Sequence, residues 1–469
     1  MFLKNKSVIS KNKFLKFITL VFLGVCGVVF GAQAQAADYY MATNGSDIIG
    51  DGSSGNEWQT LQYSMANMGS GDTLIIRDGV YTCIENTIDS THKPQNGNST
   101  DYTQIRAEHS GKVSFDGQDE NNVFALSTAS YISFEGIIWC NNNFPGAGTL
   151  VGVDSCNHIK FIHCGAYDAH DGDDGHVFSS YSSTDLLYEE CYAWGAGDYS
   201  FMPARDTERV IYRRCVSRQD RQAGWLATTG FFAYGSRNVE FQNCIYIDAD
   251  NDIGYYSARP FAWTFRYASQ GFELENTNFA GCISLNGATG GVAAGSTVSL
   301  NTAVLFSNCV SMGTYQGSRL RYDGANFDHC TFYGISALNT DTWGRGVYFE
   351  GQGSNERDDI SNSIIAGVTN NIALLNGVSQ YNCLYNNSIN YVGTSNMTGD
   401  KTMIDPLSNS LLYPLRIENN SDLDGAASDG GDIGATIFYK IGRDGTLWGE
   451  EGYNETTNES LWPFPNGYN

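Results

Sequence analysis

Apolar and polar residues alternate in short runs along most of the chain, and each run ends in a turn. In one recurring segment an aromatic residue stands three positions before a cysteine: FIHC at 161, YEEC at 188, YRRC at 212, FQNC at 241, FAGC at 279, FSNC at 306 and FDHC at 327. The steps between these cysteines are 27, 24, 29, 38, 27 and 21 residues. A recurring period of roughly 20 to 50 residues indicates a stacked-repeat architecture.

Each repeat predicts two or three short strands and no helix. In VEFQNCIYID and VLFSNCVSMG the alternation is strand-like on both sides of the cysteine, with a turn residue at the bend. Such units coil into a parallel β-helix, with successive coils about 4.8 Å apart. The cysteines then form one inward-facing stack of small apolar side chains.

Composition and cysteine count fit this interpretation. The chain has 53 Gly, 28 Tyr and 25 Phe but 8 Pro, a mixture typical of many strands joined by tight turns. Eleven cysteines follow residue 37, so at least one is unpaired, and oxidation of some neighbours stays open. No CxxC occurs, which argues against a thiolate metal site.

The first 37 residues are expected to be a signal peptide. Five lysines precede the 14-residue apolar run FITLVFLGVCGVVF, and GAQAQAAD then offers small-x-small cleavage sites. Fourteen apolar residues are too few for a stable bilayer span. We therefore predict secretion, with a β-helix over residues 38–415 and a C-terminal cap or tail over 416–469.

The net charge of the chain limits the molecules that it can bind. After residue 37 the chain has 22 basic and 51 acidic residues, a formal net charge of −29. Such a surface repels nucleic acid and anionic membrane, so neither is expected as a partner. Six arginines within 17 residues form a local exception: Arg205, Arg209, Arg213, Arg214, Arg218 and Arg221.

Both ends of the repeat region resemble secreted right-handed parallel β-helix proteins of the pectate-lyase-like superfamily. The opening DYYMATNGSDIIGDGSSGNEWQTLQYSMANMGSGDTLIIRDGVYT is similar to their N-terminal cap of strand, Gly/Asp loop, short helix and strand. The segment LYPLRIENNSDLDGAASDGGDIGATIFY resembles their closing segment with its DIGA-type strand. The resemblance implies an all-β right-handed parallel β-helix with an N-terminal cap helix and a C-terminal capping tail. It does not fix the function, because one fold carries many activities.

The loop HDGDDGH at 170–176 is similar to the calcium segment of family 9 polysaccharide lyases. Asp173, Asp174 and Gly175 match its NxDDGxD pattern, whereas Val177 replaces the last aspartate. The resemblance implies Ca²⁺ held by Asp173 and Asp174 against a substrate uronate. Asp171, Asp198 or Asp154 can replace the missing ligand from the same or adjacent coils, and we predict a site of Asp171, Asp173, Asp174 and Asp198. A plain Asp-Gly turn and a purely structural Ca²⁺ site are the alternatives.

The family's catalytic lysine has no counterpart here, because this region carries arginines. Arg205 and Arg214 are the candidate catalytic cations, and Arg221 is a candidate for substrate binding. Arg213 and Arg214 have a structural alternative. They occupy the positions of Glu189 and Glu190 one repeat later, which predicts a charge ladder between coils.

The longest repeat, between Cys244 and Cys282, contains the aromatic and cationic segment GYYSARPFAWTFRYASQGF. We predict that His176, Trp225, Arg259 and Trp263 bind substrate with Arg221, because aromatic faces stack on sugar rings and arginine pairs with carboxylates. The alternatives are a loop packed on the β-helix flank and, for His176, a hydrogen-bonding role in its loop.

Two functions follow as hypotheses. The first is Ca²⁺-assisted β-elimination of a uronate-containing extracellular polysaccharide. The second is a non-catalytic surface or matrix protein that binds carbohydrate on the same flank. In both cases we expect a monomer whose partner is an extracellular polysaccharide.

Overall fold

A computed structural model describes residues 36–82, 84–142, 148–170, 175–195, 199–218, 229–247, 261–266, 272, 274–285, 292–293, 304–314, 317–320, 325–335, 345–349, 359–369, 371–409 and 415–461. Residues 38–469 belong to one compact unit. Within the described residues, no helix is both long and apolar enough to cross a bilayer.

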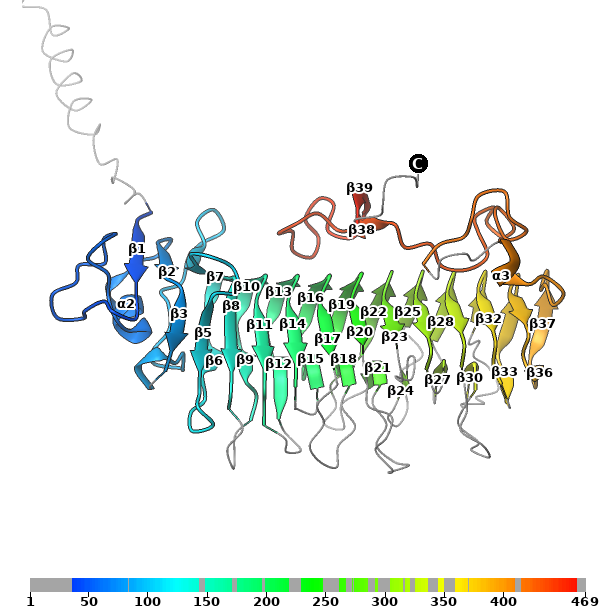
Figure 1. The fold of residues 1–469 in the computed structure, drawn as a ribbon, viewed down its shortest axis with the longest axis horizontal. Helices are drawn as coiled ribbons and strands as arrows, with labels where there is room; N and C mark the ends of the chain where they lie inside the picture. Colours follow the sequence, from blue (N-terminus) through cyan, green and yellow to red (C-terminus); the bar gives the residue numbers. More distant parts are fainter. Residues whose placement is uncertain are drawn as a thin grey trace, which may run out of the picture. The chain divides into compact units, whose positions relative to one another are not determined.

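Three long sheets run side by side through this unit (Figure 1). Sheet 1 has 14 strands in the described part of the chain: β1 (Asp38–Met41), β2 (Thr73–Ile76), β4 (Thr103–Ala107), β7 (Ser130–Glu135), β10 (Asn157–Ile162), β13 (Thr184–Glu189), β16 (Glu208–Arg213), β19 (Arg237–Gln242), β22 (Glu275–Ala280), β25 (Val304–Ser307), β28 (Ala325–Asp328), β31 (Asp359–Ser361), β34 (Val378–Gln380) and β37 (Ser395–Thr398).

The other two sheets follow the same order. Sheet 2 contains β3 (Gly79–Tyr81), β5 (Val113–Asp116), β8 (Ile137–Cys140), β11 (Gly165–Tyr167), β14 (Tyr192–Trp194), β17 (Val216–Arg218), β20 (Ile245–Ile247), β23 (Ile283–Leu285), β26 (Val310–Met312), β29 (Thr331–Tyr333), β32 (Ile364–Ala366) and β35 (Cys383–Tyr385). Sheet 3 contains β6 (Phe124–Ser127), β9 (Val151–Asp154), β12 (His176–Tyr181), β15 (Tyr199–Ala204), β18 (Thr229–Tyr234), β21 (Phe261–Arg266), β24 (Val292–Ala293), β27 (Ser318–Leu320), β30 (Val347–Phe349), β33 (Ile372–Leu375) and β36 (Ile389–Val392).

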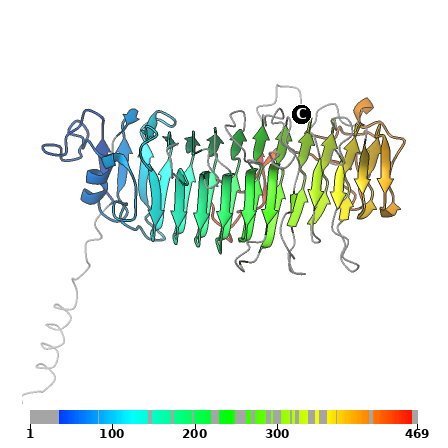
Figure 2. The same ribbon diagram turned by 90° about the horizontal axis from the view of Figure 1, so that it is seen from below.

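The chain visits the three sheets in turn, so that each circuit is one coil. It passes from β10 in sheet 1 to β11 in sheet 2 and β12 in sheet 3, then returns to sheet 1 as β13, which pairs in parallel with β10. Figure 2 shows the successive coils as parallel arrows. The predicted right-handed parallel β-helix is thereby confirmed.

The core is built from rings stacked along the coils. The aromatic residues that precede the cysteines face inward, and neighbouring ring centroids lie 4.5–5.1 Å apart from Phe161 to Phe327. A second stack in sheet 3 joins Phe178, Phe201 and Phe231, with centroids 5.1 and 5.2 Å apart. The parallel register fixes both stacks, because it places like residues of successive coils directly above one another.

The predicted cysteine stack is also present. The ten cysteines in the described residues are buried free thiols. The Cys191 thiol lies 3.4 Å from the carbonyl oxygen of Phe161 in the preceding coil, and the Cys215 thiol lies 3.3 Å from that of Tyr188. Burial raises the pKa of Cys140 to about 11 and that of Cys383 to about 12, so both thiols stay protonated at neutral pH.

The N-terminal end of the core is closed by α2 (Leu61–Asn67), as the sequence predicts, after which the short 3₁₀ helix η1 (Ile84–Asn86) follows β3. Leu61 and Met65 of α2 are buried in the same apolar cluster as Trp58 and Leu74. The helix therefore covers apolar surface that the first coil would otherwise expose.

The opposite end of the core is closed by a polar network around Asp400. Its carboxylate accepts hydrogen bonds from the Ser379 hydroxyl at 2.5 Å, the Asn382 backbone N–H at 2.8 Å and the Tyr391 hydroxyl at 2.8 Å. A charged group directed toward the last coil disfavours edge-to-edge pairing with another sheet.

The C-terminal tail reaches further than the predicted cap over the last coil. After α3 (Pro406–Asn409) it runs back over the earlier coils, and it includes the antiparallel strands β38 (Tyr439–Ile441) and β39 (Thr456–Ser460) (Figure 1). Three apolar clusters mark its path: Ile417, Leu423 and Ile433 on Ile364; Ala435 and Ile437 on Ile283 and Val310; Leu447 on Leu187 and Ile211. It takes this course because outward-facing apolar side chains of sheets 1 and 2 need cover from water.

A buried ion pair anchors the tail. The Arg213 side chain is 0% exposed and donates to Glu189 at 2.8 Å and to Gln242 at 2.9 Å. It also donates to the backbone carbonyls of Arg443 at 2.6 Å and Tyr453 at 2.8 Å, both in the tail. Since a buried guanidinium needs partners for its donors, docking of the tail completes the solvation of Arg213.

We expect Arg213→Ala to lower the free energy of unfolding by about 3 kcal/mol, because it leaves Glu189 with one cation fewer in a buried site. Limited proteolysis should then cut the tail between residues 443 and 453. The control is Arg237→Ala, which removes a 32% exposed arginine paired with Asp206 and Glu208. Arg237→Ala should lower the free energy of unfolding by about 1 kcal/mol or less. Equal losses in the two variants would contradict the anchoring role.

The tail contact at His329 should depend on pH. Its imidazole lies 3.1 Å from Asp328 and 3.5 Å from Asp429 of the tail, and the hydrogen bond to Asp328 is the main cause that raises the pKa of His329. Asp432 also acts on this imidazole through its charge. The stabilisation is complete below the unfolded pKa of about 6.5 and is lost as the pH rises through the higher folded pKa. Unfolding midpoints measured across this window should fall more steeply for the parent than for His329→Gln.

Candidate functional site

The outer face of sheet 3 carries a cluster of aromatic side chains from three successive coils. Met202 and Phe232 are buried there, and Tyr181, Tyr199 and Tyr234 pack against them half-buried. The ring centroids of Tyr199 and Phe232 lie 4.5 Å apart. Met202 and Phe232 directly follow the inward Phe201 and Phe231, and Tyr181 and Tyr234 stand three positions after Phe178 and Phe231, so strand alternation directs these four outward. Tyr199 stands two positions before Phe201 and belongs to the cluster through its contact with Phe232.

Polar groups contact this aromatic cluster from both ends of its strands. The Tyr181 hydroxyl and His176 Nδ1 share a hydrogen bond of 3.1 Å, whose donor depends on the imidazole tautomer. The His176 ring stacks on Tyr199 with centroids 5.1 Å apart. The Arg205 guanidinium lies 5.6 Å from the centre of the Tyr181 ring and is exposed. Two residues predicted from the sequence, His176 and Arg205, are thus brought together by Tyr181.

Backbone geometry fixes this arrangement. Arg205 has φ of 48°, at the bend between β15 and β16. Gly175 directly precedes His176, and a Cβ atom there would lie 1.8 Å from the His170 carbonyl oxygen. Only glycine permits this close approach, so the two ends of the loop that carries the predicted acids meet tightly beside His176. The site therefore begins where this loop enters sheet 3.

Seven predicted site residues lie outside the described residues, and their predicted roles remain predictions: Asp171, Asp173, Asp174, Asp198, Arg221, Trp225 and Arg259. In the sequence, Asp174 stands two positions before His176, and Asp198 directly precedes Tyr199.

Arg214 is placed away from this site. It follows β16 at the bend between sheets 1 and 2, whereas Arg205 lies at the bend between sheets 3 and 1. Its side chain is 7% exposed and pairs with Glu190 at 3.0 Å, Glu189 at 3.3 Å and Asp444. The structural alternative of a charge ladder is therefore the correct one for Arg214, because parallel register sets the two glutamates beneath the two arginines.

Trp263 also differs from its predicted role. Its side chain is 1% exposed and continues the inward row of Phe231, 6.2 Å from the Phe279 ring centroid and 6.1 Å from that of Phe306. A core residue cannot stack on a polysaccharide. The alternation in FAWTFR indicates a strand, but only pairing with β18 decides which alternate residues face inward.

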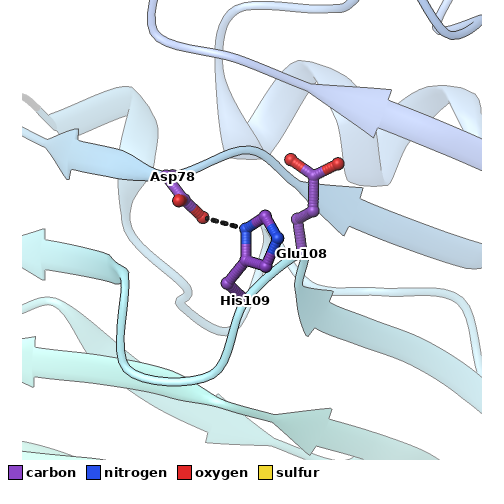
Figure 3. Close-up of side chains that lie close together, drawn as sticks. All are labelled: Asp78, Glu108 and His109. Carbon is purple, nitrogen blue, oxygen red and sulfur yellow. Dashed lines mark hydrogen bonds and ion pairs between the residues drawn. The ribbon is translucent and has the colours of Figure 1, made fainter.

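One further cluster has metal-ligand spacing within the described residues. Ligand atoms of Asp78, Glu108 and His109 lie within 4.8 Å of one another (Figure 3). The Asp78 carboxylate is 3.0 Å from His109 Nδ1, and Glu108 forms an ion pair with Arg77. Because a cation already pairs with Glu108, we interpret this group as a charge ladder between the first coils.

The sequence analysis did not predict Tyr181 or Tyr199 as site residues. A signal for Tyr181 was available in HVFSSY, where Phe178 and Tyr181 stand three positions apart and so fall on opposite faces of a strand. In YSFMPA, Tyr199 and Phe201 stand two positions apart, so alternation gives no such signal for Tyr199. Without the register, their outward rings cannot be distinguished from the many other tyrosines.

Comparisons with known proteins agree on the fold. No family model and no curated protein matches the sequence. Among solved structures, a complex of XylC with xylose matches at a TM-score of 0.50 and 10% identity over 82% of this chain and 88% of that one. Pectate lyase Pel9A matches at 0.44 and 14% identity over 85% and 95% of the two chains, and a rhamnogalacturonan lyase at 0.44 and 14% over 82% and 90%. At sequence identities of 10% and 14%, the similarity is one of fold alone.

We expect Trp263→Ala to destabilise the protein by about 3–5 kcal/mol, because it opens a cavity between stacked rings. Trp194→Ala is the matched control, since that indole is 42% exposed. Denaturant unfolding followed by circular dichroism measures both changes. A loss for Trp263→Ala no larger than for Trp194→Ala would contradict the core assignment.

Proposed function

We propose that the protein is a secreted, carbohydrate-active β-helix protein that binds a polysaccharide across the outer face of sheet 3. The observation that carries the proposal is the convergence of His176, Tyr181 and Arg205 beside half-buried tyrosine rings. Ring faces suit the apolar C–H faces of sugars, and a guanidinium pairs with a carboxylate. Polysaccharide-acting proteins with this fold, such as the pectate lyase above, make the substrate class reasonable.

The most specific form of the proposal is β-elimination on a uronate-containing polymer. In this reaction a base takes the proton from C5, next to the carboxylate, the C4–O bond breaks, the leaving oxygen takes up a proton and a C4=C5 double bond forms. Tyr181 and His176 are the proposed proton-transfer pair, because they share a hydrogen bond at the site, and Arg205 neutralises the substrate carboxylate. The predicted Ca²⁺ site at Asp171, Asp173, Asp174 and Asp198 would add charge stabilisation when the ion is bound.

A non-catalytic carbohydrate-binding protein is the second candidate. One observation favours it: His176 is 7% exposed, which limits direct access of its ring to a substrate. Binding by Arg205 and the tyrosines needs no such access.

The assay uses polygalacturonate, alginate and their carboxyl-reduced forms, with Ca²⁺ or with EDTA, and follows ultraviolet absorbance of the unsaturated product and binding in parallel. We expect Tyr181→Phe to lower the rate about 10²-fold or more with little change in binding, because it removes a proton-transfer group. Arg205→Gln should weaken binding of the uronate polymers and leave the reduced forms unchanged.

The control is Arg443→Gln, which removes a 56% exposed arginine of the tail. Binding that depends on Arg205 without any product would reject the lyase and support the second candidate. Equal binding by Arg205→Gln, Arg443→Gln and the parent would overturn the proposed site.

A further inference from the structure

A second aromatic surface lies on the outer face of sheet 2. Tyr167, Trp194 and Arg218 occupy the same position in three successive coils, because β11 pairs with β14 and β14 with β17 in parallel register. The Tyr167 and Trp194 ring centroids are 5.5 Å apart and the rings are inclined by 38°. Trp194 is 42% exposed, and Arg218 is exposed as well. We call these three residues, with Asp168, the Trp194 surface.

Within the described residues, the apolar clusters that the C-terminal tail forms on this sheet lie on other coils. Ala435 and Ile437 pack on Ile283 and Val310, two coils or more further along sheet 2. At Ile441 the tail crosses to the neighbouring bend, where its N–H donates to Asn243 at 2.7 Å. The tail residues that follow contact sheet 1 through Leu447. None of the described tail residues in these clusters packs on Trp194, which is 42% exposed.

Asp168 places a carboxylate beside Gly195, the residue that follows Trp194. Its backbone N–H donates to the Trp194 carbonyl oxygen at 3.1 Å. A Cβ atom at Gly195 would lie 2.8 Å from Asp168 Oδ1, so this carboxylate lies against the residue that follows Trp194. The surface therefore combines a flat ring, a carboxylate from the coil before it and a guanidinium from the coil after it.

We infer that the Trp194 surface is a second carbohydrate-binding site that takes one pyranose ring of a uronate polymer. The apolar C–H face of such a ring matches the indole, Asp168 can accept from its hydroxyls, and Arg218 can donate to its carboxylate. In a chain with formal net charge −24, an arginine at this position favours an anionic sugar over a neutral one. The site is on a different sheet from His176 and Arg205, so it does not depend on the function proposed for them.

The test is affinity electrophoresis through gels that contain polygalacturonate, alginate or their carboxyl-reduced forms. We expect Trp194→Ala to lose about tenfold in affinity for at least one uronate polymer, the size expected for loss of one ring contact. Arg218→Gln should lose affinity for that polymer and keep the affinity for its reduced form. Tyr439→Ala is the control, because Tyr439 is a 50% exposed aromatic residue of the tail.

Each variant is also made in the Arg205→Gln background, so that failure of the two sites can be told apart. A loss caused by Trp194→Ala in both backgrounds supports an independent site. Parent-like retardation of Trp194→Ala in every gel, with an unchanged unfolding midpoint, overturns the inference. An equal loss for Trp194→Ala and Tyr439→Ala overturns it too, since the effect would then not belong to this surface.

Discussion

The structure depends on parallel register between coils about 4.8 Å apart. Because each residue lies directly above its counterpart, any side chain must be compatible with the side chain at the same position in the neighbouring coil. Inward positions satisfy this with stacked rings and thiols, as in Phe161, Tyr188 and Tyr212. Bends satisfy it with opposite charges, as in Glu190 and Arg214. One constraint thus produces the core and the charge ladders.

The C-terminal tail covers apolar residues that the stacked coils cannot bury by themselves. A solenoid buries its inward residues, but the outward apolar residues of its sheets still face water. The tail covers part of them, and Arg213 is buried only in the presence of tail carbonyls. Docking of the tail and burial of the ion pair with Glu189 are therefore one event. Where the tail leaves sheet 2, Trp194 stays exposed.

The parallel register also arranges the outward-facing side chains of the two candidate binding surfaces. On sheet 3 the register places Tyr181 and Tyr234 at one position two coils apart, with Ala204 between them, and Tyr199 joins them from the other end of its strand. On sheet 2 the register places Tyr167, Trp194 and Arg218 in one row from successive coils. Rows of this kind repeat at the coil spacing, and a polymer of sugar rings also presents a repeated unit. Both proposals place outward aromatic rings against the apolar face of a sugar ring.

The fold was readable from the sequence, because the aromatic-x-x-Cys pattern repeats once per coil and its spacing leaves no room for a helix in each repeat. The charge ladder of Arg213 and Arg214 with Glu189 and Glu190 was readable for the same reason. Tertiary structure decided which face each alternate residue takes, placing Trp263 in the core and Tyr181 beside His176. It also decided the path of the tail. Strand alternation has two phases, and only pairing with the neighbouring coil selects one of them.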